Sequence, residues 1–302
     1  MVLPISRRNA LRNLALLAPT ASVAGAFISP TTEPSIPPTG KLKLSLNAYS
    51  FNKPLMDGSM KLDDLLEFCA MQNIDGVDLT GYYFPGYPVV PPDEFLYELK
   101  RKAFKLGVDI SGTGVRNDFT NPDAAKRKED IDLIKNWIVC ASKIGAPVIR
   151  IFSGTRIPKE YDWHTISEWM VKDIKECVAF GKAHGVVVAI QNHNDFLKTA
   201  EETIDIVKRV NSPWFGLILD IGSFRKGDPY PEIERCIPYA VNWQIKELVY
   251  VNDREEKVNL KKLSKIIKAS TYRGYLPIET LGPGDPFVKV PIFLKEVREA
   301  MG

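Results

Sequence analysis

Four oxygen-bearing side chains each stand at the end of a short apolar run in the second half of the chain. Two carboxylates and two amide oxygens suit a hard divalent cation such as Mg²⁺, Mn²⁺ or Ca²⁺ better than a metal that prefers thiolate. The alternative is a polar cluster without a metal, in which Lys246 or Arg150 neutralises the two acids. The four candidate ligands are Gln191, Asp220, Gln244 and Glu279.

Lys246 and Glu279 are also candidate catalytic residues. In the stretch "VNWQIKEL", Lys246 has the same strand parity as Gln244, so we expect both side chains on one face. The Lys246 ammonium could stabilise an enolate, and a salt bridge to Asp220 or Glu247 is its alternative role. Glu279 could accept a proton from one face of a substrate.

The remaining candidates lie near the ends of other apolar runs. His193 follows Gln191 by two residues, and its imidazole, which titrates near neutral pH, is either a ligand or acid–base group or a hydrogen-bonded surface side chain. We assign Arg150, Tyr49 and Asp78 to substrate binding. For Arg150, an ion pair with Asp78 is the favoured alternative. The flat ring of Tyr49 suits the apolar face of a sugar.

The elements that must position these residues alternate between short apolar runs and amphipathic stretches such as "DEFLYELKRKAFKLG". Several of the stretches end on glycine, which permits the left-handed residue that stops a helix, as at Gly107, Gly145 and Gly185. Eight such units in about 260 residues predict a (β/α)₈ barrel. The predicted strands are 42–49, 76–79, 108–114, 147–152, 186–191, 215–220, 240–246 and 275–279.

A barrel explains why polar and apolar residues alternate in the seventh predicted strand. Trp243 and Ile245 would pack outward against helices, and Asn242, Gln244 and Lys246 would face the interior. An open doubly wound sheet is the alternative, but no glycine-rich phosphate-binding turn follows the first strand. Because barrel enzymes build their sites at the carboxyl ends of the strands, the candidate residues are expected to share one mouth.

Four motifs in order, "AIQNHNDF", "LILDIGS", "WQIKE" and "LPIETLG", resemble the xylose isomerase-like TIM-barrel superfamily. This superfamily holds sugar isomerases and epimerases, inosose dehydratase and endonuclease IV-type enzymes. The resemblance covers residues 43–302 and implies a single metal held by Glu, Asp, His and Glu. At the matching positions this chain has Gln191, Asp220, Gln244 and Glu279, so an acid and an imidazole are replaced by amides.

The resemblance implies an isomerase or epimerase that acts on a sugar or keto-sugar with the assistance of a divalent metal. Epimerases of this type use two glutamates, and Gln191 cannot accept a proton, so a keto-glycoside lyase that works by β-elimination is one alternative. The other is a non-catalytic sugar-binding barrel. A repair nuclease would need more metal ligands than the chain's 3 histidines and its acids provide.

The N-terminus has the features of an export signal. "ISRRNALRNLALLAPTASVAGAF" pairs Arg7 with Arg8 ahead of a mildly apolar run and a small-residue cleavage pattern, which resembles a twin-arginine signal. We therefore expect a signal at 1–26, a Pro- and Thr-rich linker at 27–42, a barrel at 43–302, and a periplasmic or extracellular location. No later segment is apolar enough to insert stably in a membrane.

Composition and cysteine usage narrow the remaining possibilities. The formal net charge is only +3, with basic and acidic residues interspersed, so a nucleic-acid partner is not expected. The four cysteines are far apart, without a Cys-x-x-Cys pair, and each lies in an apolar helical context, which predicts buried free thiols. They are Cys69, Cys140, Cys177 and Cys236.

Overall fold

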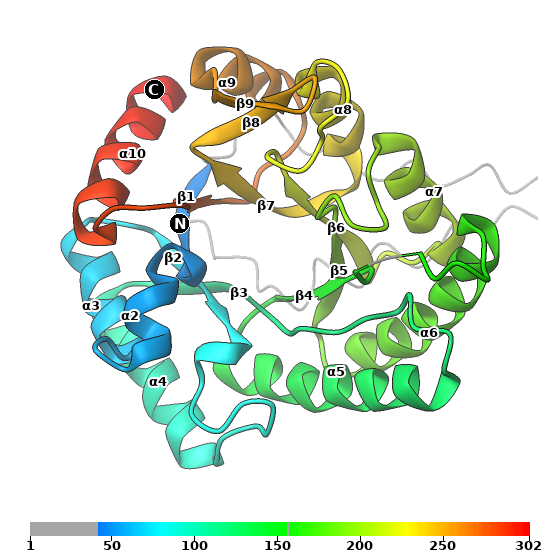
Figure 1. The fold of residues 1–302 in the computed structure, drawn as a ribbon. Helices are drawn as coiled ribbons and strands as arrows, with labels where there is room; N and C mark the ends of the chain where they lie inside the picture. The colour runs from blue at the N-terminus through cyan, green and yellow to red at the C-terminus, as the bar shows by residue number, and fades with distance from the viewer. Residues whose placement is uncertain (1–41, 156) are drawn as a thin grey trace, which may run out of the picture. The chain divides into compact units, whose positions relative to one another are not determined.

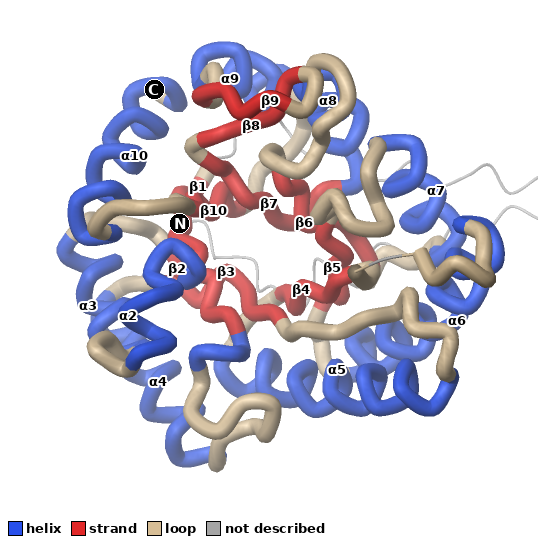
Figure 2. Tube along the Cα trace, in the orientation of Figure 1, coloured by secondary structure: helices blue, strands red, loops and turns tan. Residues whose placement is uncertain are grey.

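Eight parallel strands close into a barrel in the computed structural model, which describes residues 42–155 and 157–302. The predicted (β/α)₈ fold is confirmed. The strands form an inner ring and the helices an outer ring around it (Figure 1, Figure 2). The predicted export signal and residues 27–41 of the predicted linker lie outside the described residues.

The strands lie within two residues of their predicted bounds, and neighbours in the barrel follow the order β1-β10-β7-β6-β5-β4-β3-β2. The barrel strands are β1 (Lys43–Asn47), β2 (Gly76–Thr80), β3 (Asp109–Gly114), β4 (Val148–Phe152), β5 (Val187–Gln191), β6 (Phe215–Asp220), β7 (Ala240–Lys246) and β10 (Tyr275–Glu279). The helices are α2 (Asn52–Asp57), α3 (Leu62–Met71), α4 (Asp93–Leu106), α5 (Ala124–Ile144), α6 (Trp163–Ala183), α7 (Ala200–Val210), α8 (Pro229–Cys236), α9 (Leu260–Ala269) and α10 (Pro286–Met301).

Local signals in the sequence end the helices where the barrel needs its turns. Gly107, Gly145 and Gly185 follow α4, α5 and α6 with φ of +68°, +82° and +69°, a conformation that costs glycine little. At the other end of a helix, the Thr199 side chain accepts a hydrogen bond from the backbone of Glu202, and the Glu202 carboxylate accepts one from the backbone of Thr199. These signals set the short turns between helices and strands.

Strand β7 has the two faces that its sequence predicts. Trp243 and Ile245 are both 0% exposed on the helix side, and the indole packs edge-on against the Tyr272 ring at 5.7 Å. On the inner side, the Asn242 amide donates to the carbonyl of Ser111 across the barrel at 3.3 Å. At this level the barrel interior is therefore occupied by side chains, and the Asn242 amide is hydrogen-bonded across it.

Two parts of the fold differ from the prediction. The first strand ends at Asn47 rather than at 49, because the Asn47 side chain accepts a hydrogen bond from the Tyr49 backbone N at 2.9 Å and turns the chain into a 3₁₀ segment, Ala48–Phe51. Tyr49 thus lies in this 3₁₀ segment and not in the strand. After β7, an unpredicted antiparallel hairpin of β8 (Leu248–Val251) and β9 (Arg254–Lys257) stands outside the barrel.

Two smaller predictions can be checked against the same structure. All four cysteines are buried and free, as predicted. Among residues 42–155 and 157–302, no helix is long and apolar enough to cross a membrane.

Candidate active site

A cavity of about 420 Å³ opens at the carboxyl ends of the barrel strands. Its size falls in the range of small-molecule sites. Most of the predicted site residues line it, and Asp78 and Asp220 do not. The predicted residues at the cavity wall are Tyr49, Arg150, Gln191, His193, Gln244, Lys246 and Glu279.

The register of three neighbouring strands brings Lys246 between the two acids. Lys246 of β7 is paired with Glu279 of β10, and Gln244 of β7 is paired with Asp220 of β6. The Lys246 Nζ lies 2.7 Å from Asp220 Oδ2 and 3.3 Å from Glu279 Oε2. The side chains of the three residues are 11%, 0% and 6% exposed, so the charges meet in a site largely closed to water.

Gln191 completes the hydrogen bonding of this cluster. Its Nε2 donates to Asp220 Oδ2 at 2.8 Å and to Gln244 Oε1 at 2.7 Å. The other carboxylate oxygen of Asp220 accepts from the Gly222 backbone N at 3.0 Å. Each buried polar atom of Asp220 is therefore partnered, as burial requires.

This donor set does not fit a divalent cation. The Lys246 ammonium lies between the two carboxylates, and Gln191 presents its NH₂ group, not its carbonyl oxygen, to Asp220 and Gln244. Among residues 42–155 and 157–302, no group of three or more His, Cys, Asp or Glu side chains could hold a metal ion. The arrangement has the geometry of the alternative in which Lys246 neutralises the acids, and the metal-ligand role of the four residues stays a prediction.

Burial and charge act in opposite directions on the cluster. Burial raises the pKa of Glu279, although the Lys246 charge acts against this. For Asp220 the burial effect is outweighed by the charges of Lys246 and His193, so its pKa lies below the usual value. Burial also opposes the charge on Lys246, but Asp220 and Glu279 outweigh it and raise the Lys246 pKa. The site therefore holds a permanent ammonium beside a carboxylate that is more basic than usual.

His193 and Tyr49 also line the cavity. The His193 Nδ1 is 3.0 Å from Asp195 Oδ2, and its ring meets the edge of Phe152 at 5.0 Å. Its imidazole is 44% exposed and is therefore open to solvent. The ring of Tyr49 is half-buried and lies edge-on to Tyr82 at 6.5 Å.

Arg150 does not form the ion pair with Asp78 that was favoured for it. Its guanidinium donates to the Val115 carbonyl at 3.1 Å and to the Tyr82 hydroxyl at 3.4 Å, and it lies 4.1 Å from the centre of the Phe152 ring. A guanidinium held in this way at the cavity wall can bind a ligand oxygen.

Among the lining residues that the sequence did not predict, Arg116 and Asn117 come from the loop after β3. Arg116 stacks over the Tyr82 ring at 4.8 Å, and Asn117 exchanges two hydrogen bonds of 2.8 Å with the backbone of Phe152. The amide of Asn117 thus replaces a neighbouring strand where β3 has ended. The polar run "RNDF" directly after the third predicted strand is the signal that could have found them.

The family model described as "Xylose isomerase-like TIM barrel" matches residues 66–297. The chain belongs to this family. No curated protein matches the chain by sequence.

Solved structures of other members of this fold are similar along most of the chain. A D-psicose 3-epimerase from Clostridium cellulolyticum H10, solved with D-tagatose, has 17% identity and a TM-score of 0.71, and the match covers 86% of this chain and 99% of that one. A 3-keto-D-glucoside 4-epimerase from E. coli has 12% identity and a TM-score of 0.70, covering 86% and 100%.

A third solved structure contains a metal. The IOLI protein with a bound zinc atom has 16% identity and a TM-score of 0.68, and the match covers 85% of this chain and 96% of that one. At these identities the likeness to all three structures shows the fold alone.

In this member of the xylose isomerase-like family, Asp78 lies in the barrel interior and is 5% exposed. Burial raises its pKa to about 6, the nearby charge of Arg150 lowers it, and that of Glu279 raises it. The folded protein therefore holds this proton more tightly than the unfolded chain. The contribution of Asp78 to the free energy of unfolding therefore falls as pH rises from about 4 to about 6, and it is fully lost at higher pH.

We expect Asp78→Asn to increase the free energy of unfolding at pH 7.5 by roughly 2 to 3 kcal/mol and to change it little at pH 4, because two units of pKa are worth this much. Urea denaturation at the two pH values measures the difference. Asp253→Asn is the control, since Asp253 is 75% exposed and should change stability by less than about 0.5 kcal/mol at either pH. If Asp78→Asn changed the free energy of unfolding equally at pH 4 and pH 7.5, the raised pKa of Asp78 would be contradicted.

Proposed function

We propose that this protein is a one-base sugar isomerase-like enzyme that takes a proton from the carbon next to the carbonyl of a sugar or keto-sugar. The observation that carries the proposal is the position of the Lys246 Nζ, 2.7 Å from Asp220 and 3.3 Å from Glu279 in the floor of the mouth cavity. A general base and a fixed positive charge side by side are what enolisation of a carbonyl compound requires. The sugar-binding enzymes among the structural neighbours support the same class of substrate.

Lys246 can stabilise the developing negative charge. An ammonium has three N–H donors, and the described residues supply two acceptors for them, Asp220 and Glu279. The third N–H is left for a ligand oxygen. Because the charge is buried and already held in place, it needs little reorganisation when an oxyanion forms beside it.

Glu279 is the proposed base. It removes the proton, the C–H electron pair forms the enolate, and the charge moves to the carbonyl oxygen near Lys246. The protonated Glu279 then returns the proton to the former carbonyl carbon on the same face of the substrate. The hydroxyl proton of the first carbon passes to the oxygen beside Lys246, so that the first carbon becomes the new carbonyl. This one-face transfer suits a site in which Gln191 lies where the resemblance implies a second acid, because an amide does not accept a proton at neutral pH.

A keto-glycoside lyase is the second candidate function. It is favoured by the same observation about Gln191, because β-elimination also needs only one carboxylate. In that reaction Glu279 takes the proton, a C=C bond forms, and the group at the β-carbon leaves with its bonding electrons. Release of the leaving group would distinguish it from isomerisation.

We expect Glu279→Gln to slow the exchange of the proton next to the carbonyl for deuterium by about 10²- to 10⁴-fold, in D-fructose, D-tagatose or a 3-keto-glucoside dissolved in D₂O. Lys246→Met should slow the same exchange by about 10²- to 10³-fold. Proton NMR of the carbon next to the carbonyl measures the exchange. Lys43→Met is the matched control, because Lys43 pairs with Asp109 at the opposite ends of the strands. Wild-type exchange in Glu279→Gln would rule out this base, and no exchange with any of the sugars would favour a non-catalytic binding barrel.

The donor set of this site does not support the predicted divalent metal. Titration with Mn²⁺ tests this directly. We expect the wild-type protein to show no saturable Mn²⁺ site in calorimetric titration at micromolar concentration. Lys246→Met should bind Mn²⁺ at least tenfold more tightly, because it leaves two carboxylates without their counter-charge. Thermal denaturation checks that the variant is folded. One tight equivalent of Mn²⁺ in the wild type, with the same affinity in Lys246→Met, would restore the metal site.

We also propose that the protein is exported in the folded state to the periplasm or the cell exterior. The paired Arg7 and Arg8 ahead of an apolar run support this. Replacing both with lysine should retain the full chain in the cytoplasm, as measured by cell fractionation. Arg12→Lys, outside the pair, should be exported normally. Export of the double variant at the normal level would argue against a twin-arginine signal.

A further inference from the structure

A second and larger cavity adjoins the mouth cavity at Lys246. It has a volume of about 860 Å³, against about 420 Å³ for the mouth cavity. The two share three lining residues, His193, Lys246 and Leu281. A ligand whose reacting part lies beside Lys246 therefore has space to continue into the second cavity.

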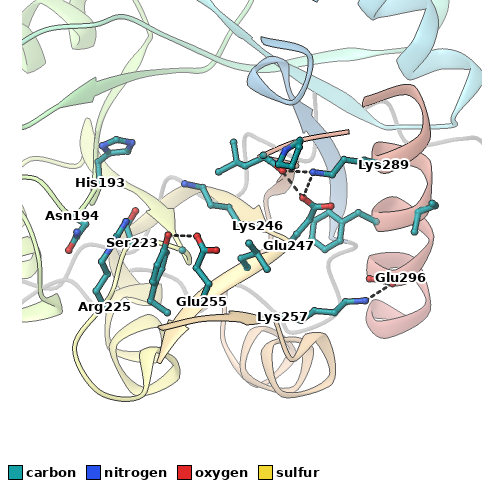
Figure 3. A pocket seen from close by; sticks show the side chains of 18 residues that line it. His193, Asn194, Ser223, Arg225, Lys246, Glu247, Glu255, Lys257, Lys289 and Glu296 are labelled. Atoms are coloured by element: carbon teal, nitrogen blue, oxygen red, sulfur yellow. Dashed lines mark hydrogen bonds and ion pairs between the residues drawn. The ribbon is translucent and has the colours of Figure 1, made fainter. Parts of the chain in front are cut away.

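The walls of this second cavity come from parts of the chain outside the barrel strands. The hairpin β8–β9 forms one wall and helix α10 another, with the loop around Gly282 between them (Figure 3). Figure 3 also shows Lys246 between these walls and His193. The hairpin follows β7 with only Glu247 in between, so the same segment that supplies Lys246 also builds the cavity.

Most of the charged side chains in this cavity are already paired with each other. Lys257 is 2.7 Å from Glu296, and Lys289 is 3.1 Å from Glu247 (Figure 3). The hydroxyl of Tyr250 donates to Glu255 at 2.7 Å. A strongly charged group such as a phosphate would have to break these pairs. A neutral group would not.

What the cavity offers a ligand is apolar surface. Leu248, Leu281 and Ile292 line it and are 39%, 38% and 57% exposed, although large aliphatic side chains gain from being covered. The Arg225 guanidinium lies over the Tyr250 ring, 3.9 Å from its centre, and both residues line the same cavity. Flat apolar groups pack well against aliphatic side chains and guanidinium planes.

We propose that the cavity between the β8–β9 hairpin and α10 binds an aromatic substituent of the sugar that reacts beside Lys246. The substrate class is then an aryl glycoside or aryl-substituted keto-sugar. This inference rests on the proposed function, because that function places the sugar in the mouth cavity. It adds the part of the substrate that sets specificity.

Calorimetry with three probes tests the inference: 4-nitrophenyl β-D-glucopyranoside, methyl β-D-glucopyranoside and cellobiose. The aryl glycoside should bind at least tenfold more tightly than the other two, because only its ring covers the apolar wall. Ile292→Glu and Leu248→Ala should each remove most of that preference and leave methyl glucoside binding within twofold. Val288→Glu is the matched control, because Val288 is also on α10 and 56% exposed but does not line the cavity.

The outcomes separate this inference from the proposed function. If the aryl and methyl glycosides bind equally, or Ile292→Glu weakens both equally, the aromatic subsite is refuted, and proton exchange into keto-sugars still decides the proposed function. Tighter binding of cellobiose than of the aryl glycoside would assign the cavity to a second sugar and overturn the proposal. An aryl preference that Ile292→Glu abolishes, in a protein without any proton exchange, would uphold the subsite and reject the proposed chemistry.

Discussion

The Lys246 ammonium, held between Asp220 and Glu279, is the interaction on which the site depends. Two carboxylates buried this close would each cost several kcal/mol without a counter-charge. The strand register provides that charge, because β7 lies between β6 and β10 and presents Lys246 next to Glu279. Gln191 then donates to the remaining acceptor positions of Asp220 and Gln244. The floor of the mouth is thus fully formed by the chain's own side chains.

The barrel and most of its inward residues could be predicted because strand alternation and helix-ending glycines are local signals. Parity alone places Gln191, Gln244 and Lys246 on the inner face, and parallel strands bring their carboxyl ends together. The parity of a residue along its strand does not give the distance between side chains on different strands. Whether Lys246 reaches both acids, or leaves room for a cation between them, depends on the stagger of three strands that are far apart in sequence. The sequence therefore leaves that choice open, and in the structure the Lys246 Nζ lies 2.7 Å from Asp220 and 3.3 Å from Glu279.

The features that the sequence did not predict are those in which a side chain bonds the backbone where a strand ends, or in which a turn forms an extra hairpin. Asn47 ends β1 by accepting from the backbone of Tyr49, and Asn117 bonds the backbone of Phe152 after β3 has ended. The β8–β9 hairpin turns at Asn252 and Asp253, whose φ values are +51° and +62°. Asparagine and aspartate tolerate this conformation and are common in such two-residue turns. The Asn252-Asp253 dipeptide between two β-rich runs therefore indicates a hairpin, although this hairpin lies outside the repeating strand–helix pattern.

The balance of charge inside the barrel explains why the acids differ from one another. Among the described residues, the interior holds three carboxyl groups, Asp78, Asp220 and Glu279, against two cations, Lys246 and Arg150. One negative charge is in excess. Asp220, which bonds Lys246 directly, has a lowered pKa, and the pKa values of Asp78 and Glu279 are raised. Proton transfer from a ligand to Glu279 would keep the total charge constant and move the negative charge onto a ligand oxygen beside Lys246. A fixed ammonium can stabilise that charge without a change in its own partners, which is why the same ion pair that permits burial of the acids also suits the proposed chemistry.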